Sequence, residues 1–225
     1  MKNKPNVSAI IVAAGESQRM KGIDKVLASL AGRPVLAHVL AAFDKCKSID
    51  NIVLVVNSKS LEACKQLAAG LTTPIDICRG GKRRQDSVAA GLKRLKDCDW
   101  VVIHDGARPL VTKELIEQGL KAAKETGAAV AAVPVTDTIK VVGEDKVVRE
   151  TPPRQNLWAV QTPQVFRFDI ITGAYRQAKG EATDDAALVE RAGYRVKLYP
   201  GAYDNIKITT PQDRLVAEAL LKGSS

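Results

Sequence analysis

The sequence predicts an α/β fold built on a mostly parallel sheet, and two observations support this. Short runs rich in Val and Ile recur along the chain without the polar alternation of a solvent-facing strand, as is typical of strands buried on both faces. Segments with the apolar spacing of helices separate these runs, and such alternation gives a parallel sheet flanked by helices. We expect the central strands at Val7–Val12, Ile52–Val56, Trp100–Ile103 and Ala128–Val133.

The intervening helices are predicted from apolar residues three or four positions apart. They are expected at Val35–Phe43, Ser60–Leu67, Val88–Leu95 and Lys113–Ala123.

The alternation of strands and helices stops after Pro134. The segment TDTIKVVGEDKVVRET predicts two short strands joined around Gly143, which is a hairpin. A two-stranded hairpin is marginally stable in water, so it needs a surface to pack on, and a second subunit could supply one. At ~150 residues per domain, the length favours a single domain over residues 1–225, with this β-arm as an insertion at about 136–156.

The C-terminal part returns to helices and one strand. We expect helices at Asp169–Ala178, Asp184–Arg191 and Pro211–Lys222, and a strand at Arg195–Tyr199. Thr183, followed by Asp184 and Asp185, resembles a helix N-cap with acids in the first turn. Capping is therefore favoured over a catalytic or metal-binding role for these aspartates.

The composition indicates a folded cytoplasmic protein. Hydrophobic residues make up 45% and charged residues 26%, which supports a packed core and excludes disorder. The uncharged stretch 126–136 has 11 residues, and no uncharged stretch in the sequence reaches the roughly 18 of a membrane span. No secretion signal is predicted, because polar residues follow the first apolar run. The four cysteines form no CxxC pair, so we expect reduced, mostly buried thiols rather than a zinc site.

The charge of the chain favours an anionic partner. Lys and Arg number 34 against 25 acids, a net charge of +9. A nucleic acid, a nucleotide and a phosphorylated metabolite all fit this excess.

The segment AAGESQRMKGIDK follows the first strand, where open parallel sheets bind ligands. Its small residues permit close approach of a phosphate chain, and its cations suit a triphosphate. The small residues are Ala13, Ala14 and Gly15, and the cations are Arg19, Lys21 and Lys25. Neither GxGxxG nor GxxxxGK[ST] is present, so a turn with solvated cations is the alternative.

The segment CRGGKRRQDSV follows a predicted strand at Ile75–Cys78 and opens a helix near Asp86. Gly80 and Gly81 permit close approach to a base or ribose, and Ser87 offers a hydroxyl at the helix start. The alternative is a nucleic-acid-binding patch, although no aromatic residue is interleaved for base stacking. That patch would comprise Arg79, Lys82, Arg83 and Arg84.

The segment WVVIHDGARPL is an apolar strand that ends at Asp105 and continues through Gly106 and Arg108. An acid at this position could hold Mg²⁺ between nucleotide phosphates, or could only brace Arg108. We interpret His104 as structural.

Taken together, these blocks resemble one family. AAGESQRM, DKVL, GGKRRQDSV, HDGARP, PVTDTIK, LWAVQTPQ and DNIKITTPQD occur in this order in 2-C-methyl-D-erythritol 4-phosphate cytidylyltransferases of the non-mevalonate isoprenoid route. The resemblance runs from about Val7 to Leu220. It implies a Rossmann-like, mostly parallel twisted sheet flanked by helices, and a homodimer with an exchanged β-arm. It also implies transfer of a cytidylyl group from CTP with loss of pyrophosphate, with Mg²⁺ or another divalent cation such as Mn²⁺.

The resemblance also implies roles for individual residues. The catalytic group would be Arg19, Lys25, Arg154 and Lys207, and the first two would neutralise charge at the α-phosphate. The CTP pocket would be lined by Ala13, Ala14, Gly15, Gly80, Gly81, Ser87 and Gly106. Asp105 would hold the metal or order the substrate, and Arg108 would also bind substrate. The methylerythritol phosphate would be held by Thr138, Arg154, Thr162 and Lys207. Thr138 and Arg154 are expected from the partner subunit.

Two positions depart from the pattern. Many relatives have a second glycine where this chain has Ser17, and some have an acid where it has Lys82. Neither change removes an expected catalytic cation.

Two other functions compete with this one. A cytidylyltransferase for ribitol 5-phosphate or another polyol phosphate would share the triphosphate loop, but TDTIK and NIKITTP argue against it. A non-catalytic nucleic-acid-binding protein would explain the net charge, but we expect neither a nucleic acid nor a membrane as partner.

Overall fold

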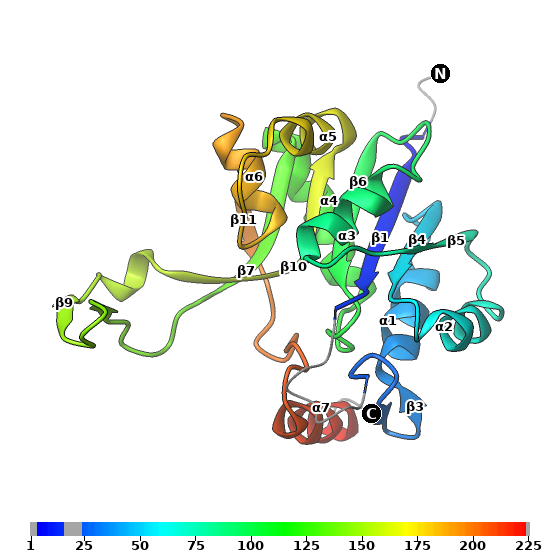
Figure 1. The fold of residues 1–225 in the computed structure, drawn as a ribbon, viewed down its shortest axis with the longest axis horizontal. Coiled ribbons are helices and arrows are strands. Elements are labelled where there is room, and N and C mark those ends of the chain that lie inside the picture. Colours follow the sequence, from blue (N-terminus) through cyan, green and yellow to red (C-terminus); the bar gives the residue numbers. More distant parts are fainter. Residues whose placement is uncertain (1–3, 16–23, 224–225) are drawn as a thin grey trace.

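The computed structural model describes residues 4–15 and 24–223 (Figure 1). Its main sheet has seven strands in the order β11-β7-β10-β6-β1-β4-β5. They are β1 (Val7–Ala13), β4 (Asn51–Val56), β5 (Ile75–Arg79), β6 (Trp100–Asp105), β7 (Ala128–Pro134), β10 (Trp158–Arg167) and β11 (Lys197–Pro200). Strand β10 runs antiparallel to β6 and β7, whereas the other pairs are parallel. The predicted mostly parallel sheet is confirmed.

Helices cover both faces of this sheet (Figure 1). They are α1 (Val35–Asp44), α2 (Leu61–Ala68), α3 (Arg84–Leu92), α4 (Lys113–Thr126), α5 (Phe168–Gln177) and α6 (Asp185–Arg191). A further helix, α7 (Pro211–Gly223), lies apart from the sheet at the bottom of Figure 1. Ile11 of β1 packs in a core cluster with residues of α1 and α4, while its neighbour Ile10 packs with residues of α3, α5 and α6. Successive strand residues point to opposite faces, so both must be apolar in a covered strand. This explains the uninterrupted apolar runs in the sequence.

Three details differ from the sequence predictions. Helix α3 begins at Arg84 rather than near Asp86, because its first turn consists of polar side chains that are half-buried or buried and give no apolar signal. The N-cap of α6 is Asp184, whose carboxylate accepts a hydrogen bond from the Ala187 amide, so the prediction of Thr183 was wrong. The segment LWAVQTPQVF, for which no element was predicted, forms most of β10.

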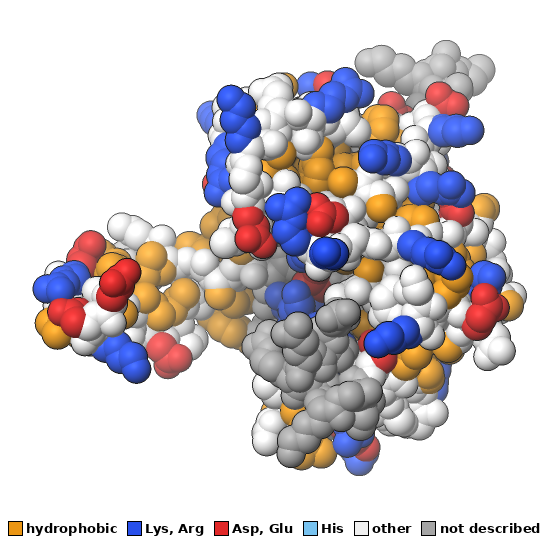
Figure 2. All heavy atoms as spheres, in the orientation of Figure 1, with side chains coloured by type: hydrophobic (Ala, Val, Ile, Leu, Met, Phe, Trp, Pro, Cys, Tyr) orange, Lys and Arg blue, Asp and Glu red, His pale blue; other side chains and the backbone are white. Residues whose placement is uncertain are grey.

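The predicted hairpin is confirmed as a projecting arm. Its strands β8 (Val141–Val142) and β9 (Val148–Glu150) pair antiparallel, and a 3₁₀ turn at Arg154–Asn156 leads back to β10. The arm extends away from the body of the molecule (Figure 1). Its apolar side chains are exposed by 39% to 52%, and Figure 2 shows them gathered on the arm. They are Ile139, Val141, Val142, Val147 and Val148.

The remaining elements are small. Strands β2 (Ser29–Leu30) and β3 (Arg33–Pro34) form a short hairpin before α1. Within 4–15 and 24–223, no helix is both long and apolar enough to cross a membrane.

Candidate active site

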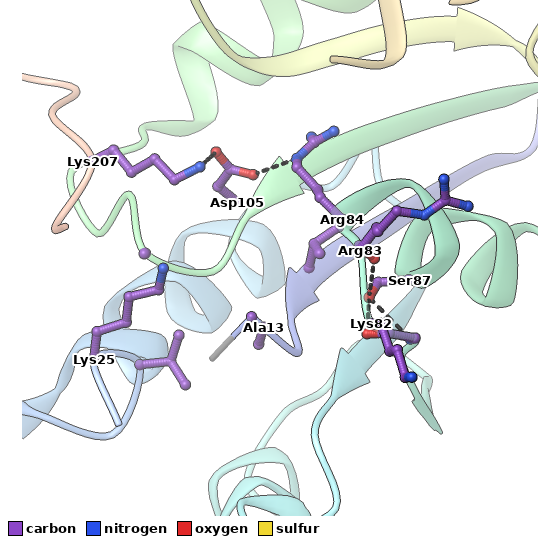
Figure 3. A pocket seen from close by; sticks show the side chains of 13 residues that line it. Ala13, Lys25, Lys82, Arg83, Arg84, Ser87, Asp105 and Lys207 are labelled. Carbon is purple, nitrogen blue, oxygen red and sulfur yellow. Dashed lines mark hydrogen bonds and ion pairs between the residues drawn. The ribbon is translucent and has the colours of Figure 1, made fainter. Parts of the chain in front are cut away.

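The carboxyl ends of β6, β1 and β5 lie along one edge of the sheet, with β4 between β1 and β5, and they carry the three loops singled out in the sequence. Val12 of β1 pairs in register with Asp105 of β6. Together the loops enclose a pocket, which we call the loop pocket (Figure 3). Among the residues predicted from sequence, it is lined by Ala13, Gly15, Lys25, Gly81, Ser87, Asp105 and Lys207.

The glycine pair is required by close packing. A Cβ atom on Gly80 would lie 2.3 Å from Cβ of Ala14 and 2.6 Å from Oγ of Ser87. The Ser87 hydroxyl accepts a hydrogen bond from the Gly81 amide at 3.2 Å and donates to the Arg83 carbonyl at 3.2 Å. Ser87 therefore holds the glycine loop against the start of α3, and Ala14 and Gly80 act as packing residues behind the pocket.

Gly106 brings the third loop against the first strand. Its amide donates to the Val12 carbonyl at 2.9 Å, and a Cβ atom here would lie 3.1 Å from Cβ of Ala13. A glycine at this position therefore lets the chain pass close behind the pocket.

Lys25 supplies a cation from the first loop. Its side chain lines the loop pocket, and its Nζ atom lies 3.9 Å from the position that a Cβ on Gly15 would take. Arg19, Lys21 and Ser17 fall outside the described residues.

Asp105 is surrounded by cations. Its Oδ1 accepts from Nε of Arg84 at 3.1 Å, and its Oδ2 accepts from Nζ of Lys207 at 2.7 Å. Nε of Arg108 lies 3.7 Å from Oδ2. Burial alone would raise the pKa of the Asp105 carboxyl, but the charges of Arg84 and Lys207 outweigh it and hold the pKa well below its usual range. Asp105 thus does more than brace Arg108.

The loop that carries Lys207 is tied to the sheet by a buried amide. Asn205 donates from Nδ2 to the Thr162 carbonyl at 2.8 Å, and its own carbonyl accepts from Nη1 of Arg108 at 2.7 Å. The Ile208 amide donates to the Ala107 carbonyl at 2.8 Å. These bonds bring Lys207 to Asp105, although the two residues are far apart in the sequence.

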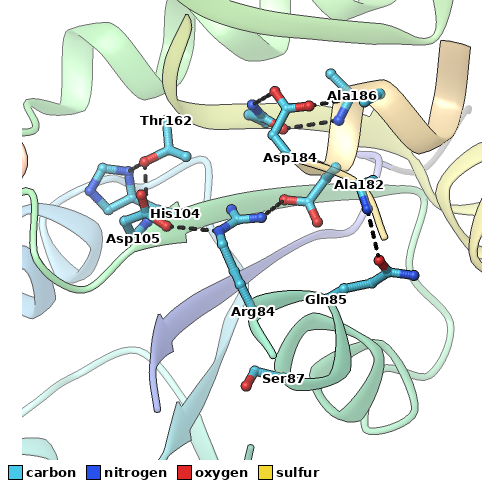
Figure 4. Close-up of polar contacts among 12 residues, drawn as sticks. Arg84, Gln85, Ser87, His104, Asp105, Thr162, Ala182, Asp184 and Ala186 are labelled. Carbon is cyan, nitrogen blue, oxygen red and sulfur yellow. Dashed lines mark hydrogen bonds and ion pairs between the residues drawn. The ribbon is translucent and has the colours of Figure 1, made fainter. Parts of the chain in front are cut away.

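A second pocket lies on the other side of Asp105, and we call it the sheet pocket. Arg108, Thr162 and Trp158 contribute to its wall. The Thr162 hydroxyl accepts a hydrogen bond from the Asp105 amide at 3.1 Å (Figure 4). Of the residues that the structure describes, three line both pockets, and they are Arg84, Asp105 and Lys207. They form a charged boundary between the two spaces.

Thr138 and Arg154 lie away from both pockets. Both are exposed on the arm and line neither pocket, and Nη1 of Arg154 donates to the Thr136 carbonyl at 2.6 Å. Within one chain, the structure does not bring them to Lys25 or Asp105.

The potential metal ligands are few. In the described part of the chain, no group of three or more His, Cys, Asp or Glu side chains is placed to hold a metal ion. Asp105 is the one acid among the described residues that line the loop pocket, against the cations Lys25, Lys82, Arg83, Arg84 and Lys207. Such a pocket suits a polyphosphate, and a divalent cation here would take most of its ligands from phosphates and water.

Comparisons with known proteins agree with this chemistry. The sequence profile of the family described as "IspD: 2-C-methyl-D-erythritol 4-phosphate cytidylyltransferase" matches residues 7–223. Proteins of that name from Dehalococcoides mccartyi and Caldanaerobacter subterraneus subsp. tengcongensis are 55% and 50% identical to this chain. The alignments cover 96% of this chain in both cases, with 96% and 99% of the respective relative.

A solved structure is also similar. The 4-diphosphocytidyl-2C-methyl-D-erythritol synthase from Anaerococcus prevotii superposes with a TM-score of 0.88 at 32% identity, covering 98% of this chain and all of that one.

Proposed function

Because the chain belongs to the 2-C-methyl-D-erythritol 4-phosphate cytidylyltransferase family, we propose that the loop pocket and the sheet pocket are the two halves of its active site. The enzyme transfers a cytidylyl group from CTP to 2-C-methyl-D-erythritol 4-phosphate, giving 4-diphosphocytidyl-2-C-methyl-D-erythritol and pyrophosphate in the non-mevalonate route. The observation that carries the proposal is the boundary of Arg84, Asp105 and Lys207 shared by both pockets. The reacting phosphates would meet there.

The loop pocket would bind CTP. Its floor of small residues and backbone lets a triphosphate approach Lys25, and Arg19 would join it from the same loop. Gly80 packs tightly against Ala14 and Ser87, which supports a narrow, backbone-lined space for a pyrimidine. The CTP site would be lined by Ala13, Gly15, Gly81 and Ser87, with Ala14, Gly80 and Gly106 packed behind this lining.

The sheet pocket would bind methylerythritol phosphate. Arg108, Thr162 and Lys207 come from this chain, and Asp105 holds Lys207 in place. Thr138 and Arg154 of the partner subunit would complete the site. The exposed apolar face of the arm supports this proposal, because such a face needs a surface to pack on, and a second copy of the chain would provide one.

The chemistry needs no protein base. A phosphate oxygen of methylerythritol phosphate attacks the α-phosphorus of CTP, and the bond from that phosphorus to the β-phosphate oxygen breaks. The attacking monoester is already nucleophilic at neutral pH, so positioning and charge neutralisation supply the rate. Lys25, Arg19, Lys207 and Arg154 would neutralise charge on the reacting phosphates.

A divalent cation, Mg²⁺ or Mn²⁺, would bind with CTP and neutralise part of its charge. Asp105 is the carboxylate that would face it from the loop pocket. Both oxygens of Asp105 already accept from Arg84 and Lys207, so the donor set fits a cation held mainly by the phosphates.

We further propose that the chain works as one domain in a homodimer in the cytoplasm. All four cysteines are free, and Cys46, Cys64 and Cys98 are buried, with pKa values that burial raises. Unpaired, unreactive thiols suit a reducing compartment.

A nucleic-acid-binding role gains less support. Of the cations that would form its patch, Arg83 is paired with Asp86, and Arg84 is paired with Asp105 and Asp185. DNA affinity that persists at moderate salt would favour that role.

The proposed acceptor is tested by pyrophosphate release from CTP and Mg²⁺ in parallel assays. One assay contains methylerythritol phosphate and the other contains ribitol 5-phosphate at the same concentration. We expect rapid release with the first and little with the second. Equal or faster release with ribitol 5-phosphate would overturn the assignment of the sheet pocket.

A further inference from the structure

The guanidinium of Arg84 joins two carboxylates from different parts of the fold (Figure 4). Its Nε donates to Oδ1 of Asp105, at the end of β6, and its Nη1 donates to Oδ2 of Asp185, at the start of α6, at 2.8 Å. Asp185 is buried, and its other oxygen accepts from the Tyr175 hydroxyl of α5 at 2.5 Å. Asp185 is therefore fixed by two helices and serves as an anchor for Arg84.

The same line of contacts continues into the active site. One carboxylate oxygen of Asp105 accepts a hydrogen bond from Arg84, and the other pairs with the ammonium group of Lys207. Among the described residues, Arg108 is the third cation paired with Asp105, and its Nε is farther away, at 3.7 Å. Arg84 is thus the group that links the position of Lys207 to the helices behind the site.

The two cations on Asp105 constrain it differently. A lysine ammonium is a mobile point charge on a flexible stem, whereas a guanidinium is a rigid planar fork. Arg84 is held at a second point by Asp185, so it can fix the plane of the Asp105 carboxylate, which Lys207 alone cannot do.

The placement of Arg84 is not the one that stability alone would favour. Its Nη2 atom is buried and has no hydrogen-bond partner among the described residues. A buried donor without a partner is costly to folding, and such groups in native proteins call for a reason beyond stability. The shared boundary of the two pockets supplies one, because Arg84 lies on it.

We propose that Arg84 is a positioning residue for cytidylyl transfer: anchored by Asp185, it orients Asp105 so that Lys207 stays at the boundary where the two substrates meet. The proposal rests on the proposed function, in which Lys207 contacts the acceptor phosphate.

The first test compares Arg84→Met with a matched control, Arg94→Met. Arg94 also forms a two-bond pair with a carboxylate, that of Asp76, at 2.7 and 3.1 Å, but it is exposed and lines neither pocket. Misplacing a reacting group by about 1 Å can cost about 10²-fold in rate. We expect Arg84→Met to lower kcat by about 10- to 100-fold and to change KM for CTP by less than about 3-fold, whereas Arg94→Met keeps wild-type kinetics. Wild-type kcat in Arg84→Met overturns the proposal.

A conservative variant separates charge from geometry. Arg84→Lys keeps the positive charge but cannot bridge both carboxylates with a rigid fork. We expect it to fold and to remain at least about 10-fold below wild-type kcat. Full recovery with lysine would show that charge alone suffices and would overturn the positioning role.

A double-mutant cycle tests whether Arg84 acts through Lys207. In a Lys207→Ala background, Arg84→Met should lower kcat by less than about 3-fold further, because the group it positions is gone. An undiminished second loss overturns this proposal alone. If Lys207→Ala by itself keeps wild-type kcat, the assignment of Lys207 in the proposed function is wrong, and this proposal falls with it. If Arg84→Met does not fold, Asp185→Asn replaces it in the same cycle. We expect Asp185→Asn to lower kcat by a smaller factor in the wild-type background and not to lower it in the Lys207→Ala background.

Discussion

Oγ1 of Thr162 lies 3.0 Å from Nδ1 of His104 in the buried layer beneath Asp105. The other ring nitrogen, Nε2, lies 3.2 Å from the Arg108 carbonyl. Because a carbonyl only accepts, Nε2 carries the proton and Nδ1 accepts the proton of the Thr162 hydroxyl. Thr162 therefore uses its one donor inside the protein. Toward methylerythritol phosphate its oxygen can accept, from a substrate hydroxyl, but cannot donate to a phosphate.

This arrangement makes stability depend on pH. Burial lowers the pKa of His104 to about 4, against 6.5 in the unfolded chain. Between these values the unfolded chain binds a proton that the folded chain does not, so stability falls as the pH drops from 6.5 toward 4. We expect the free energy of unfolding in urea to be about 2 kcal/mol smaller at pH 5 than at pH 7 from this group. The pKa of Asp105 is lowered on folding, so this group makes stability depend on pH only below its ordinary pKa of 3.8.

His104→Asn provides the control for this prediction. The variant should be less stable at pH 7, because the ring that contacts Phe43 is lost, but its stability should change less between pH 7 and pH 5. The same pH dependence in both proteins would mean that His104 is not the titrating group.

Removal of a loop cation should separate chemistry from folding. Lys25→Ala removes a charge but no core volume, because Lys25 is only half-buried, so the melting temperature should change little. We expect the same of Arg19→Ala. Loss of one transition-state stabiliser costs about 10²-fold in kcat. Steady-state kinetics and thermal melting measure both effects, with Lys121→Ala, an exposed site on α4, as the control. Near-normal kcat would reduce the tested residue to a solvated surface charge.

Gly80→Ala should damage the CTP half of the site. The added methyl group would collide with Ala14 and Ser87, and overpacking of this kind costs about 1–3 kcal/mol. We expect a lower melting temperature and a KM for CTP raised by at least about 10-fold. Gly173→Ala in α5 meets no atom within 4 Å and should leave both unchanged or slightly raise stability. If the two variants behave alike, the packing of Gly80 does not shape the pocket.

Nucleotide choice tests the narrow pocket beside Gly80 and Gly81. CTP should be preferred over ATP, GTP and UTP in kcat/KM. Discrimination against UTP depends on one exocyclic amino group, which is worth about 10⁴- to 10⁵-fold at most. Equal turnover of CTP and ATP would contradict a backbone-lined pyrimidine site.

The fold could be predicted where burial and apolarity coincide. Strands β1, β4, β6 and β7 carry continuous apolar runs, and the sequence locates them closely. Strand β10 has polar residues at its buried centre, and its Gln161 and Gln164 are satisfied by hydrogen bonds to Asn205 and Asp184. Hydrophobic periodicity carries no signal for such a strand.

The site could be predicted in part for a similar reason. Strand ends and the family resemblance point to Lys25, Asp105 and Lys207, which the structure places around one pocket. The sequence places Arg84 in a possible surface patch, because its two carboxylate partners lie 21 and 101 residues away. No local pattern indicates a pair at such separation.

The proposed mechanism requires an active site that is completed by the arm of a second chain. Lys25→Ala and Arg154→Ala homodimers should each be nearly inactive. In a mixed dimer, one site then inherits both lesions and the other neither. Unfolding and refolding equal amounts together makes about half the dimers mixed, each with one of two sites intact, so pyrophosphate release should recover to about one quarter of wild type. If the mixture stays as inactive as its parents although mixed dimers are shown to form, Arg154 acts within its own chain and the shared site is wrong.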